Sequence, residues 1–338
     1  MRTRRIFLSV LLASAILSCR KDNSPSEPPL PSGIWVPLSL DYTGDVTDIF
    51  LLKKDTVVVT SYMDFNTYPT KTIFFQSNNG GRKWLPWKSI RLDAGGIRGI
   101  FCLNANSIYA GGGEALYYSG DNAKSWDTLN PNSNGYIPLH FFNKSRGILY
   151  TSSATFLTTN GGVSFFRVHD RKFLKAQFFN NSVGYACTNI NLLKTNDGGN
   201  TWSVFGPIWK DHELISTIHF ITENTGYMVV DLYMNGIAGF IRRGCDLYKT
   251  TDAGNTWIKV NDKIDENFNI VPYSCYFLNE QVGFLAGRYK ILKTNDGGVT
   301  WSEDYVDSTF RSINKMVFTE AGIGYAIGTD GLILKRNK

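Results

Sequence analysis

The 338-residue sequence predicts an all-β protein: a seven-bladed β-propeller of four-stranded antiparallel blades. Three observations support this fold. A short polar turn that ends in an aromatic residue recurs at intervals of 37 to 55 residues. Short apolar runs, several of which begin with Gly and an aromatic residue, come before each copy. The last unit has no fourth strand, whereas a strand without a unit of its own stands near the start of the chain.

The composition favours strands over helices. The chain contains 32 Gly, 17 Tyr, 22 Phe and 8 Trp residues, and only 19% of its residues are charged. Aromatic and glycine enrichment without long helix-forming runs is typical of many strands joined by tight turns. The hydrophobic fraction of 43% is ample for a packed core.

Residues 1–18 resemble a bacterial lipoprotein signal peptide. A basic start precedes the apolar run 6–17, which is too short to span a bilayer. The resemblance implies cleavage before Cys19 and lipid attachment to that residue, so that acyl chains anchor the protein in a membrane. An ordinary secretory signal with a chance cysteine is the alternative.

Residues 19–33 are predicted to form a lipidated, disordered tether rich in Pro and Ser. Arg20, rather than Asp, follows the cysteine, so the lipoprotein resemblance implies an outer-membrane location, facing the periplasm or the cell surface. Removal of Arg2, Arg4 and Arg5 would lower the formal charge from +6 to +3. Such a weak excess gives no case for nucleic-acid binding.

Six copies of the polar turn, here called the repeat turns, follow one pattern: Ser or Thr, any residue, Asp or Asn, any residue, Gly, two residues, then an aromatic. We expect each Asp or Asn to accept a hydrogen bond from the backbone two residues on, and Gly to supply a positive φ. These side chains therefore have structural rather than catalytic roles. The Asp or Asn positions are Asn79, Asp121, Asn160, Asp197, Asp252 and Asp296.

Residues 34–338 are predicted to form the propeller, with each repeat turn joining the third and fourth strands of a blade. The second strands are expected at 56–60, 107–111, 147–151, 184–188, 226–230, 283–287 and 324–328. The N-terminal strand should complete the last blade and so remove two open sheet edges. Seven equivalent aromatic residues result, which bury area at the blade edges: Trp35, Trp84, Trp126, Phe165, Trp202, Trp257 and Trp301.

The pattern resembles the Asp-box, or bacterial neuraminidase repeat, over essentially all of 34–338. The unit containing "GYACT" and "LLKTNDGGNTW" is most similar to the photosystem II assembly and stability factor family of seven-bladed propellers. That resemblance implies no catalysis, binding to assembly intermediates of membrane proteins, and arginines on one face. Arg98 and Arg311 match the arginine position before the first strand, whereas other blades carry Ile137, Leu174, Ser216 or Tyr273 there.

Binding is expected on the face formed by the loops between blades and between strands two and three. Its largest insertion, 230–246, mixes aromatic residues with arginine, a combination favoured at protein interfaces. A self-packed hairpin extension is the alternative for this insertion. Arg167, Arg171 and Lys290 would add positive charge to the face. The candidate partner-binding residues are Arg98, Trp209, Lys210, Tyr233, Phe240, Arg242, Arg243, Arg288 and Arg311.

Catalysis is not expected, because the early Arg-Ile-Pro motif of sialidases is absent. Carboxylates in the variable loops are interpreted as solvated: Asp64, Glu114, Asp211, Glu213 and Asp231. The His and Cys spacings predict no metal site and no cofactor, and they assign no disulfide. The sequence thus favours a monomeric, non-catalytic envelope lipoprotein that acts as a protein-binding scaffold or assembly factor. The alternative is a carbohydrate-binding or sialidase-like glycoside hydrolase propeller.

Overall fold

A computed structural model describes residues 32–338 except 41, 43, 54, 63–70, 92–95, 114, 131–134, 208–211, 237–238 and 263. The chain divides into two units, Met1–Leu30 and Pro31–Lys338, and all the described residues belong to the second. The predicted signal peptide, Cys19 and most of the tether lie outside the described residues. Ser32 already bridges to Asn337, so the ordered body begins slightly before residue 34. Within the described part of the chain, no helix is long and apolar enough to cross a membrane.

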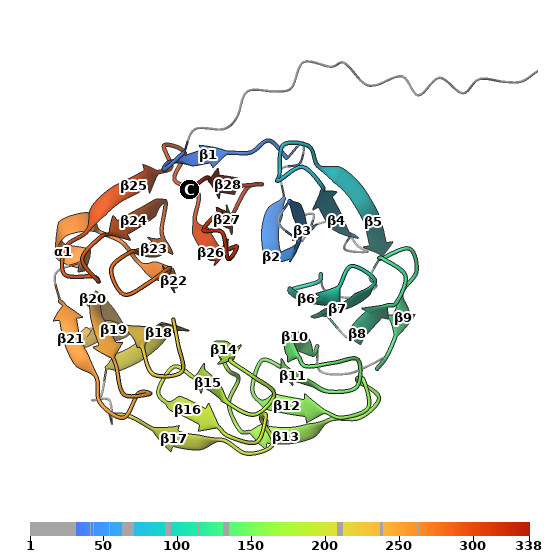
Figure 1. The fold of residues 1–338 in the computed structure, drawn as a ribbon, viewed down its shortest axis with the longest axis horizontal. Coiled ribbons are helices and arrows are strands. Elements are labelled where there is room, and N and C mark those ends of the chain that lie inside the picture. Colours follow the sequence, from blue (N-terminus) through green and yellow to red (C-terminus); the bar gives the residue numbers. More distant parts are fainter. Residues whose placement is uncertain are drawn as a thin grey trace, which may run out of the picture. The chain divides into compact units, whose positions relative to one another are not determined.

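The second unit is a ring of seven four-stranded antiparallel sheets, as predicted (Figure 1). The first strand of each blade lies nearest the axis: β2 Asp45–Lys53, β6 Gly99–Asn104, β10 Ile137–Phe141, β14 Lys175–Phe178, β18 Glu213–Phe220, β22 Pro272–Phe277 and β26 Ile313–Phe318. The second strands contain all seven predicted ranges or most of each: β3 Thr56–Tyr62, β7 Ser107–Gly112, β11 Gly147–Tyr150, β15 Gly184–Cys187, β19 Gly226–Gly236, β23 Gly283–Gly287 and β27 Gly324–Gly328.

The third strands lead into the repeat turns, or in the last blade to the end of the chain: β4 Lys71–Ser77, β8 Ala115–Ser119, β12 Thr155–Thr158, β16 Leu192–Thr195, β20 Gly239–Thr250, β24 Lys290–Thr294 and β28 Ile333–Arg336. The fourth strands form the rim: β5 Leu85–Arg91, β9 Asp127–Thr128, β13 Phe166–His169, β17 Ser203–Phe205, β21 Ile258–Asn261, β25 Ser302–Val306 and β1 Trp35–Pro37. A short helix, α1 (Ile264–Phe268), lies between blades five and six.

The N-terminal strand closes the ring as the sequence predicts. Strand β1 pairs with β28, with Trp35 opposite Arg336 and Val36 opposite Lys335. The Trp35 ring packs edge-on against Phe284 of blade six and Phe318 of blade seven, at centroid distances of 6.1 and 5.9 Å. Closure therefore joins the two ends of the chain through backbone pairing and through a buried aromatic contact between blades.

Neighbouring blades are joined by stacked aromatic rings near the axis. The Tyr227 ring of β19 lies 3.5 Å from the Phe277 ring of β22, with an interplanar angle of 1°. The Tyr227 hydroxyl donates to the Glu280 carbonyl at 2.9 Å. On its other side, Phe277 lies against Gly283, where an added Cβ would come within 2.4 Å of the ring. The recurrent Gly-aromatic start of the second strands therefore serves the blade junction.

The repeat turns use a different hydrogen bond from the one expected. The Asp296 Oδ1 atom accepts from the backbone N–H of Thr300, four residues on rather than two, at 2.9 Å. The Thr294 hydroxyl donates to the same Asp296 oxygen and accepts from the Gly298 N–H. The N–H of Asp296 itself points to Thr294 Oγ1 at 3.3 Å. The carboxylate therefore spans the whole turn, because its oxygen reaches the residue just before the aromatic.

This bonding recurs in all six repeat turns. In each copy an Asp or Asn oxygen accepts the N–H four residues on, from Lys83, Ser125, Ser164, Thr201, Thr256 or Thr300. In the last three turns the indole N–H of the aromatic also donates to a turn carbonyl: Trp202 to Gly199, Trp257 to Gly254 and Trp301 to Gly298. The predicted structural role of the turns agrees with this bonding.

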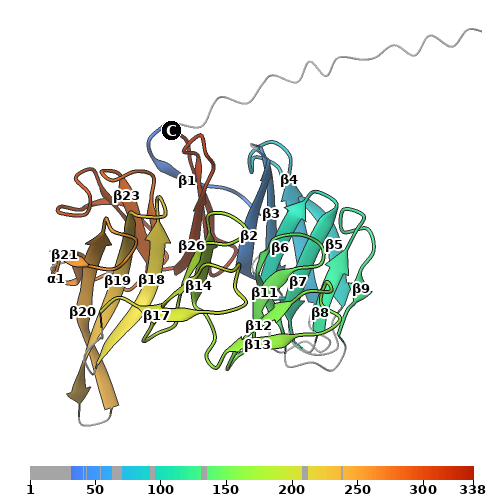
Figure 2. The same ribbon diagram turned by 60° about the horizontal axis from the view of Figure 1, so that its bottom comes forward.

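The hairpin of β19 and β20 is longer than its counterparts in the other blades, which accounts for the 55-residue spacing between Trp202 and Trp257. Figure 2 shows the ends of these two strands extending past the neighbouring blades. A register shift between Leu232 and Tyr233 marks a bulge in the hairpin. The guanidinium of Arg242 donates twice to Asp231 Oδ1, at 3.0 and 2.9 Å, and so braces the two strands.

Candidate binding face

The two faces of the ring differ in how their loops are built. The repeat turns lie beside the turns between first and second strands; for example, the Gly161 N–H donates to the Ser145 carbonyl. On the opposite face lie the connections between blades and the turns between second and third strands, here called the loop face. The loop face contains the large insertion and the positions predicted to bind a partner.

A groove of about 720 Å³ opens on the loop face between blades three and four. It is formed by two turns between second and third strands and by the connection between the blades. Its lining residues are Ser152, Ser153, Asp170, Arg171, Lys172, Leu174 and Asn189. None of these is aromatic, so apart from Leu174 the groove presents hydroxyl, amide and charged groups rather than a stacking surface.

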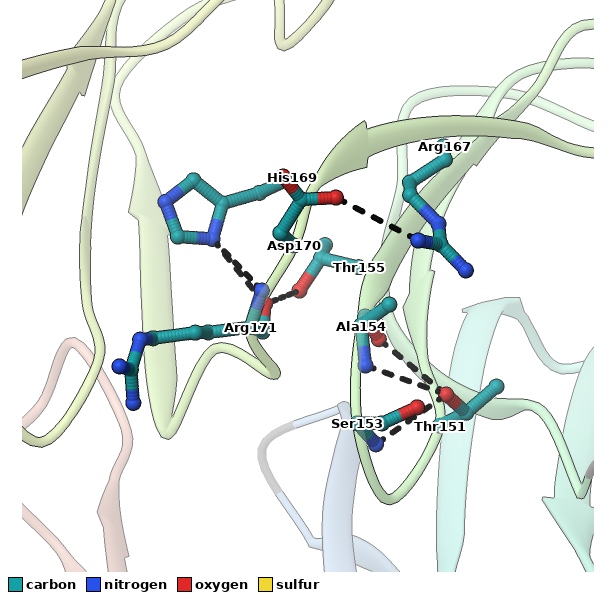
Figure 3. Close-up of polar contacts among 8 residues, drawn as sticks. All are labelled: Thr151, Ser153, Ala154, Thr155, Arg167, His169, Asp170 and Arg171. Atoms are coloured by element: carbon teal, nitrogen blue, oxygen red, sulfur yellow. Dashed lines mark hydrogen bonds and ion pairs between the residues drawn. The ribbon is translucent and has the colours of Figure 1, made fainter.

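Hydrogen bonds fix the groove walls (Figure 3). The Thr151 hydroxyl accepts from the N–H of Ala154 at 3.3 Å, which closes the turn that carries Ser152 and Ser153. The Thr155 hydroxyl donates to the Arg171 carbonyl at 2.9 Å and accepts from the Phe173 N–H at 3.0 Å. These two hydrogen bonds therefore fix the connection between the blades to strand β12.

The turn across the groove repeats the same chemistry. The Thr188 hydroxyl accepts from the Asn191 N–H at 3.0 Å, and the Thr188 N–H donates to the Asn191 carbonyl at 2.9 Å. Such local side-chain bonds stabilise tight turns. Asn189 is held at the tip of this turn. Two structurally matched turns therefore frame the groove.

The groove carries a positive excess. Its one carboxylate, Asp170, forms an exposed ion pair with Arg167 at 3.4 Å. Arg171 and Lys172 are exposed, and neither forms an ion pair with any described residue. Figure 3 shows the Arg171 side chain pointing away from the Thr151 turn while its backbone is held by His169 and Thr155. Both cations are therefore available to an acidic ligand.

The predicted partner-binding arginines fall into two groups. Arg98, Arg243 and Arg288 are exposed on the loop face and make no ion pair with the described residues. Arg242 is instead paired with Asp231 at 2.9 Å, and Arg311 with Asp307 at 2.8 Å. Two of the expected surface charges thus help to hold local structure. Tyr233 is half-buried, and its N–H donates to the His212 carbonyl at 2.8 Å.

Other predicted positions are only partly described. Trp209 and Lys210 lie outside the described residues, as do Asp64, Glu114 and Asp211. Phe240 lies in β20 opposite Asn235. The interpretation of Asp231 as a solvated loop carboxylate is wrong, because this residue lies in β19, is 8% exposed and binds Arg242. The sequence does not predict the ion pair between Asp231 and Arg242. The two residues are 11 positions apart, and the bulge between Leu232 and Tyr233 changes which residues of the hairpin face each other.

The described residues include no group of three or more His, Cys, Asp or Glu side chains placed to hold a metal ion. Cys102, Cys187, Cys245 and Cys275 are buried, and no disulfide joins any two of these described cysteines. Burial raises the pKa of both Cys187 and Cys275 to about 12, so these thiols are protonated at neutral pH. Their surroundings fit small core side chains rather than nucleophiles.

Lys172, Ser152, Ser153 and Asn189 were not singled out by the sequence. A signal was present, because "TSSA" at 151–154 and "TNIN" at 188–191 both place Thr at the end of a second strand with small or polar residues after it. Only the ring brings these two turns, 37 residues apart, to the two sides of one groove.

No family model and no curated protein matches the chain. The solved structure "YCF48 bound to D1 peptide" is similar, with a TM-score of 0.68 and 16% identity over 92% of this chain and 99% of that chain. "YCF48 from Cyanidioschyzon merolae" has a TM-score of 0.66 and 17% identity over 90% and 99%. The GH74 enzyme of Niastella koreensis has a TM-score of 0.62 and 15% identity over 89% of this chain.

These likenesses show a shared propeller fold. The chain spans nearly the whole of each YCF48 structure but only 53% of the Niastella koreensis enzyme. The seven-bladed propeller is therefore established for this chain, and its activity must be argued from its own surface.

Proposed function

We propose that this chain is a non-catalytic scaffold of the cell envelope, held at a membrane through Cys19, that binds an acidic segment of a protein partner on its loop face. The observation that carries the proposal is the groove between blades three and four. Arg171 and Lys172 stand there on braced loops, without an ion pair to any described residue. Charge-assisted hydrogen bonds to carboxylates are the contacts that such side chains favour.

Three further features support this proposal. Arg98, Arg243 and Arg288 add exposed positive charge to the same face. The rigid ring provides a preorganised surface, which lowers the entropic cost of binding. A structure of similar fold, "YCF48 bound to D1 peptide", holds a peptide. The sequence resemblance to assembly factors of membrane protein complexes points to the same class of function.

Charge reversal in the groove tests the proposal. The variant Arg171→Glu with Lys172→Glu is compared with wild type in pull-downs from detergent-solubilised envelopes, followed by binding measurements with the purified partner. We expect affinity to fall at least about tenfold, since a charge pair that becomes buried in the complex contributes about 1.4 kcal/mol or more. The matched control reverses two exposed lysines on the opposite face, Lys83→Glu with Lys144→Glu. Equal capture by the groove variant and wild type would contradict the proposal.

Carbohydrate binding or hydrolysis is the second candidate, supported by the fold likeness to GH74 enzymes. The groove is less suited to it, because sugar rings stack on aromatic faces and the described lining residues have none. Binding on a glycan array, or turnover of fluorogenic glycosides by the purified protein, would favour this candidate. Loss of that signal in the Arg171→Glu, Lys172→Glu variant would place the sugar in the groove.

A further inference from the structure

Two bulky aromatic residues on the loop face have unusual backbone conformations. Tyr289, in the turn between β23 and β24, has φ of 46°, and Phe310, between blades six and seven, has φ of 61°. Among the described residues with positive φ, they are the only Phe, Tyr or Trp. Positive φ is sterically unfavourable for large side chains, and Gly or Asn is the ordinary choice at such positions. A persistent outlier of this kind is a reason to look for function.

The two aromatic rings form a projecting pair. Their centroids are 5.4 Å apart and their planes are at 86°, the edge-to-face arrangement. Phe310 is 73% exposed, more than any other large hydrophobic side chain in the described part of the protein. Lys290 Nζ lies 5.9 Å from the centroid of the Tyr289 ring and also binds Glu303. The Lys290 side chain therefore contacts the Tyr289 ring, while the Phe310 ring keeps most of its surface exposed.

A buried carboxylate holds the turn that presents Phe310. Asp307, only 1% exposed, accepts from the N–H of Thr309 at 2.9 Å and from the Arg311 guanidinium at 2.8 Å. The Asp307 N–H donates to the Tyr289 carbonyl at 2.8 Å, and its own carbonyl accepts from the Phe310 N–H at 3.2 Å. The same residue therefore fixes both strained positions, so the projection of the pair is preorganised.

Folding alone does not account for the aromatic side chain at position 310. The ring leaves most of its surface in water, so its burial contributes little to stability, while its backbone conformation disfavours it. Arg288 is exposed beside the pair, and an isolated bridge from Arg288 to Ser312 ties the two loops together. A convex apolar knob cannot enclose a ligand, so a partner must supply the pocket around it.

We propose that Phe310, seated on Tyr289, is an anchor side chain that inserts into an apolar pocket of a protein partner whose rim carries a carboxylate facing Arg288. The inference rests on the proposed protein-binding function and names a second contact site for the same partner. Aromatic residues at the centre of a protein interface, with arginine beside them, commonly carry much of the binding energy.

Photocrosslinking tests the contact directly. Benzoylphenylalanine replaces Phe310 in one version of the full chain and Phe166, an exposed residue of the rim strand β13, in the control. We expect adducts of the 310 version with one protein, mapped by mass spectrometry, and none of these at 166. With that partner purified, Phe310→Ala should raise Kd at least about tenfold, whereas Phe310→Trp and Phe166→Ala should stay near wild type.

Thermal stability separates a contact role from a folding role. Because Asn tolerates positive φ, Phe310→Asn should unfold at the same temperature as wild type or at a higher one, while it loses binding as Phe310→Ala does. A marked fall in melting temperature in both variants would assign Phe310 to folding and overturn the inference. Adducts with lipid alone, an absence of adducts at 310, or unchanged partner affinity of Phe310→Ala would also overturn it. If the groove variant still loses its partner in those cases, the proposed function stands without this anchor.

Discussion

At the scale of single residues, the repeated Asp side chains are turn-forming groups. Two hydrogen bonds to the carboxylate lower the pKa of Asp121 to about 2: the larger effect comes from the N–H of Ser125 and the next from the Ser125 hydroxyl. The hydroxyl and the N–H of Thr300 likewise lower the pKa of Asp296. Each of the four Asp side chains, like Asn79 and Asn160, satisfies donors of its own turn, so the six side chains lie at six separate turns around the ring. They do not converge on one site.

Removal of one such carboxylate should destabilise the protein measurably. Asp296→Ala loses bonds from Thr294, from the Thr300 N–H and from the Thr300 hydroxyl, and we expect a cost of about 1–2 kcal/mol in the free energy of unfolding. Asp296→Asn keeps the acceptor oxygen, as Asn79 and Asn160 do in their turns, and should cost less than half as much. Urea unfolding at pH 7 measures both. Equal losses would show that charge, not acceptor geometry, matters.

The lowered pKa values also predict an acid-sensitive fold. In the folded state the pKa of Asp121 and that of Asp197 are about 2, below the value of about 3.9 for an unfolded chain. Their stabilisation is therefore complete above about pH 4 and is lost as pH falls through 2. Urea midpoints at pH 5, 3 and 2 should fall steadily in wild type. The double variant Asp121→Asn, Asp197→Asn should show a shallower fall; an identical slope would contradict this account.

At the scale of elements, the contact between two blades is the recurring unit of packing. The Tyr of one second strand stacks on the Phe that ends the next blade's inner strand, as in Tyr109 with Phe141 at 3.7 Å and Tyr185 with Phe220 at 4.1 Å. The Tyr hydroxyl then binds a carbonyl of the next blade, as Tyr185 does with Glu223 at 2.9 Å. The repeated Tyr and Phe of each blade therefore specify its contact with the next blade as well as its own strands.

A methyl group at the glycine behind this stack should disturb the junction. In Gly283→Ala the new Cβ would lie about 2.4 Å from two atoms of the Phe277 ring, so either the ring or the strand must shift. We expect a loss of about 1–3 kcal/mol in the free energy of unfolding, the usual range for overpacking. Gly120→Ala is the control, since its nearest atom is 3.3 Å away at an adaptable Tyr118 side chain. Similar losses in both variants would refute the steric explanation.

At the scale of the whole molecule, closure depends on one short strand. Strand β1 has only three residues, yet it covers the outer edge of β28 and buries Trp35 to 5% exposure. Arg336 adds a bond to the Gly33 carbonyl at 2.8 Å. Without β1, the last blade would present an unpaired edge, which promotes association between chains. Strand β1 and the last three strands of the chain thus form one blade.

Truncation of the closing side chain should weaken the whole ring. We expect Trp35→Ala to lower the free energy of unfolding by about 3–5 kcal/mol, as large core truncations do, and to promote aggregation on heating. Ile34→Ala, at a neighbouring position that is 50% exposed, should change it by less than about 0.5 kcal/mol. Urea unfolding and light scattering measure the two effects. A Trp35→Ala protein as stable as wild type would show that closure does not need this contact.

Seven blades, the order of their strands, the place of the repeat turns and the closing strand could all be predicted from the sequence. Each rests on a local pattern that is repeated along the chain, so one weak copy, such as Ala123 in the second turn, does not hide the others. The exact hydrogen bond of the turn could not be predicted, because an Asp oxygen can reach N–H groups either two or four residues on. Which N–H the Asp oxygen accepts depends on the backbone conformation of the turn glycine and of the strand that follows the turn.

The sequence alone therefore determined the architecture of this protein, since propeller blades are encoded by short-range patterns of apolar, aromatic and turn residues. Only the tertiary structure decided which charges remain available at the surface. Arg242 and Arg311 are taken up by Asp231 and Asp307, while Arg171 and Lys172 stay open in the groove. Such differences arise from bulges, turn conformations and contacts between blades, which are set by the placement of separate segments in space.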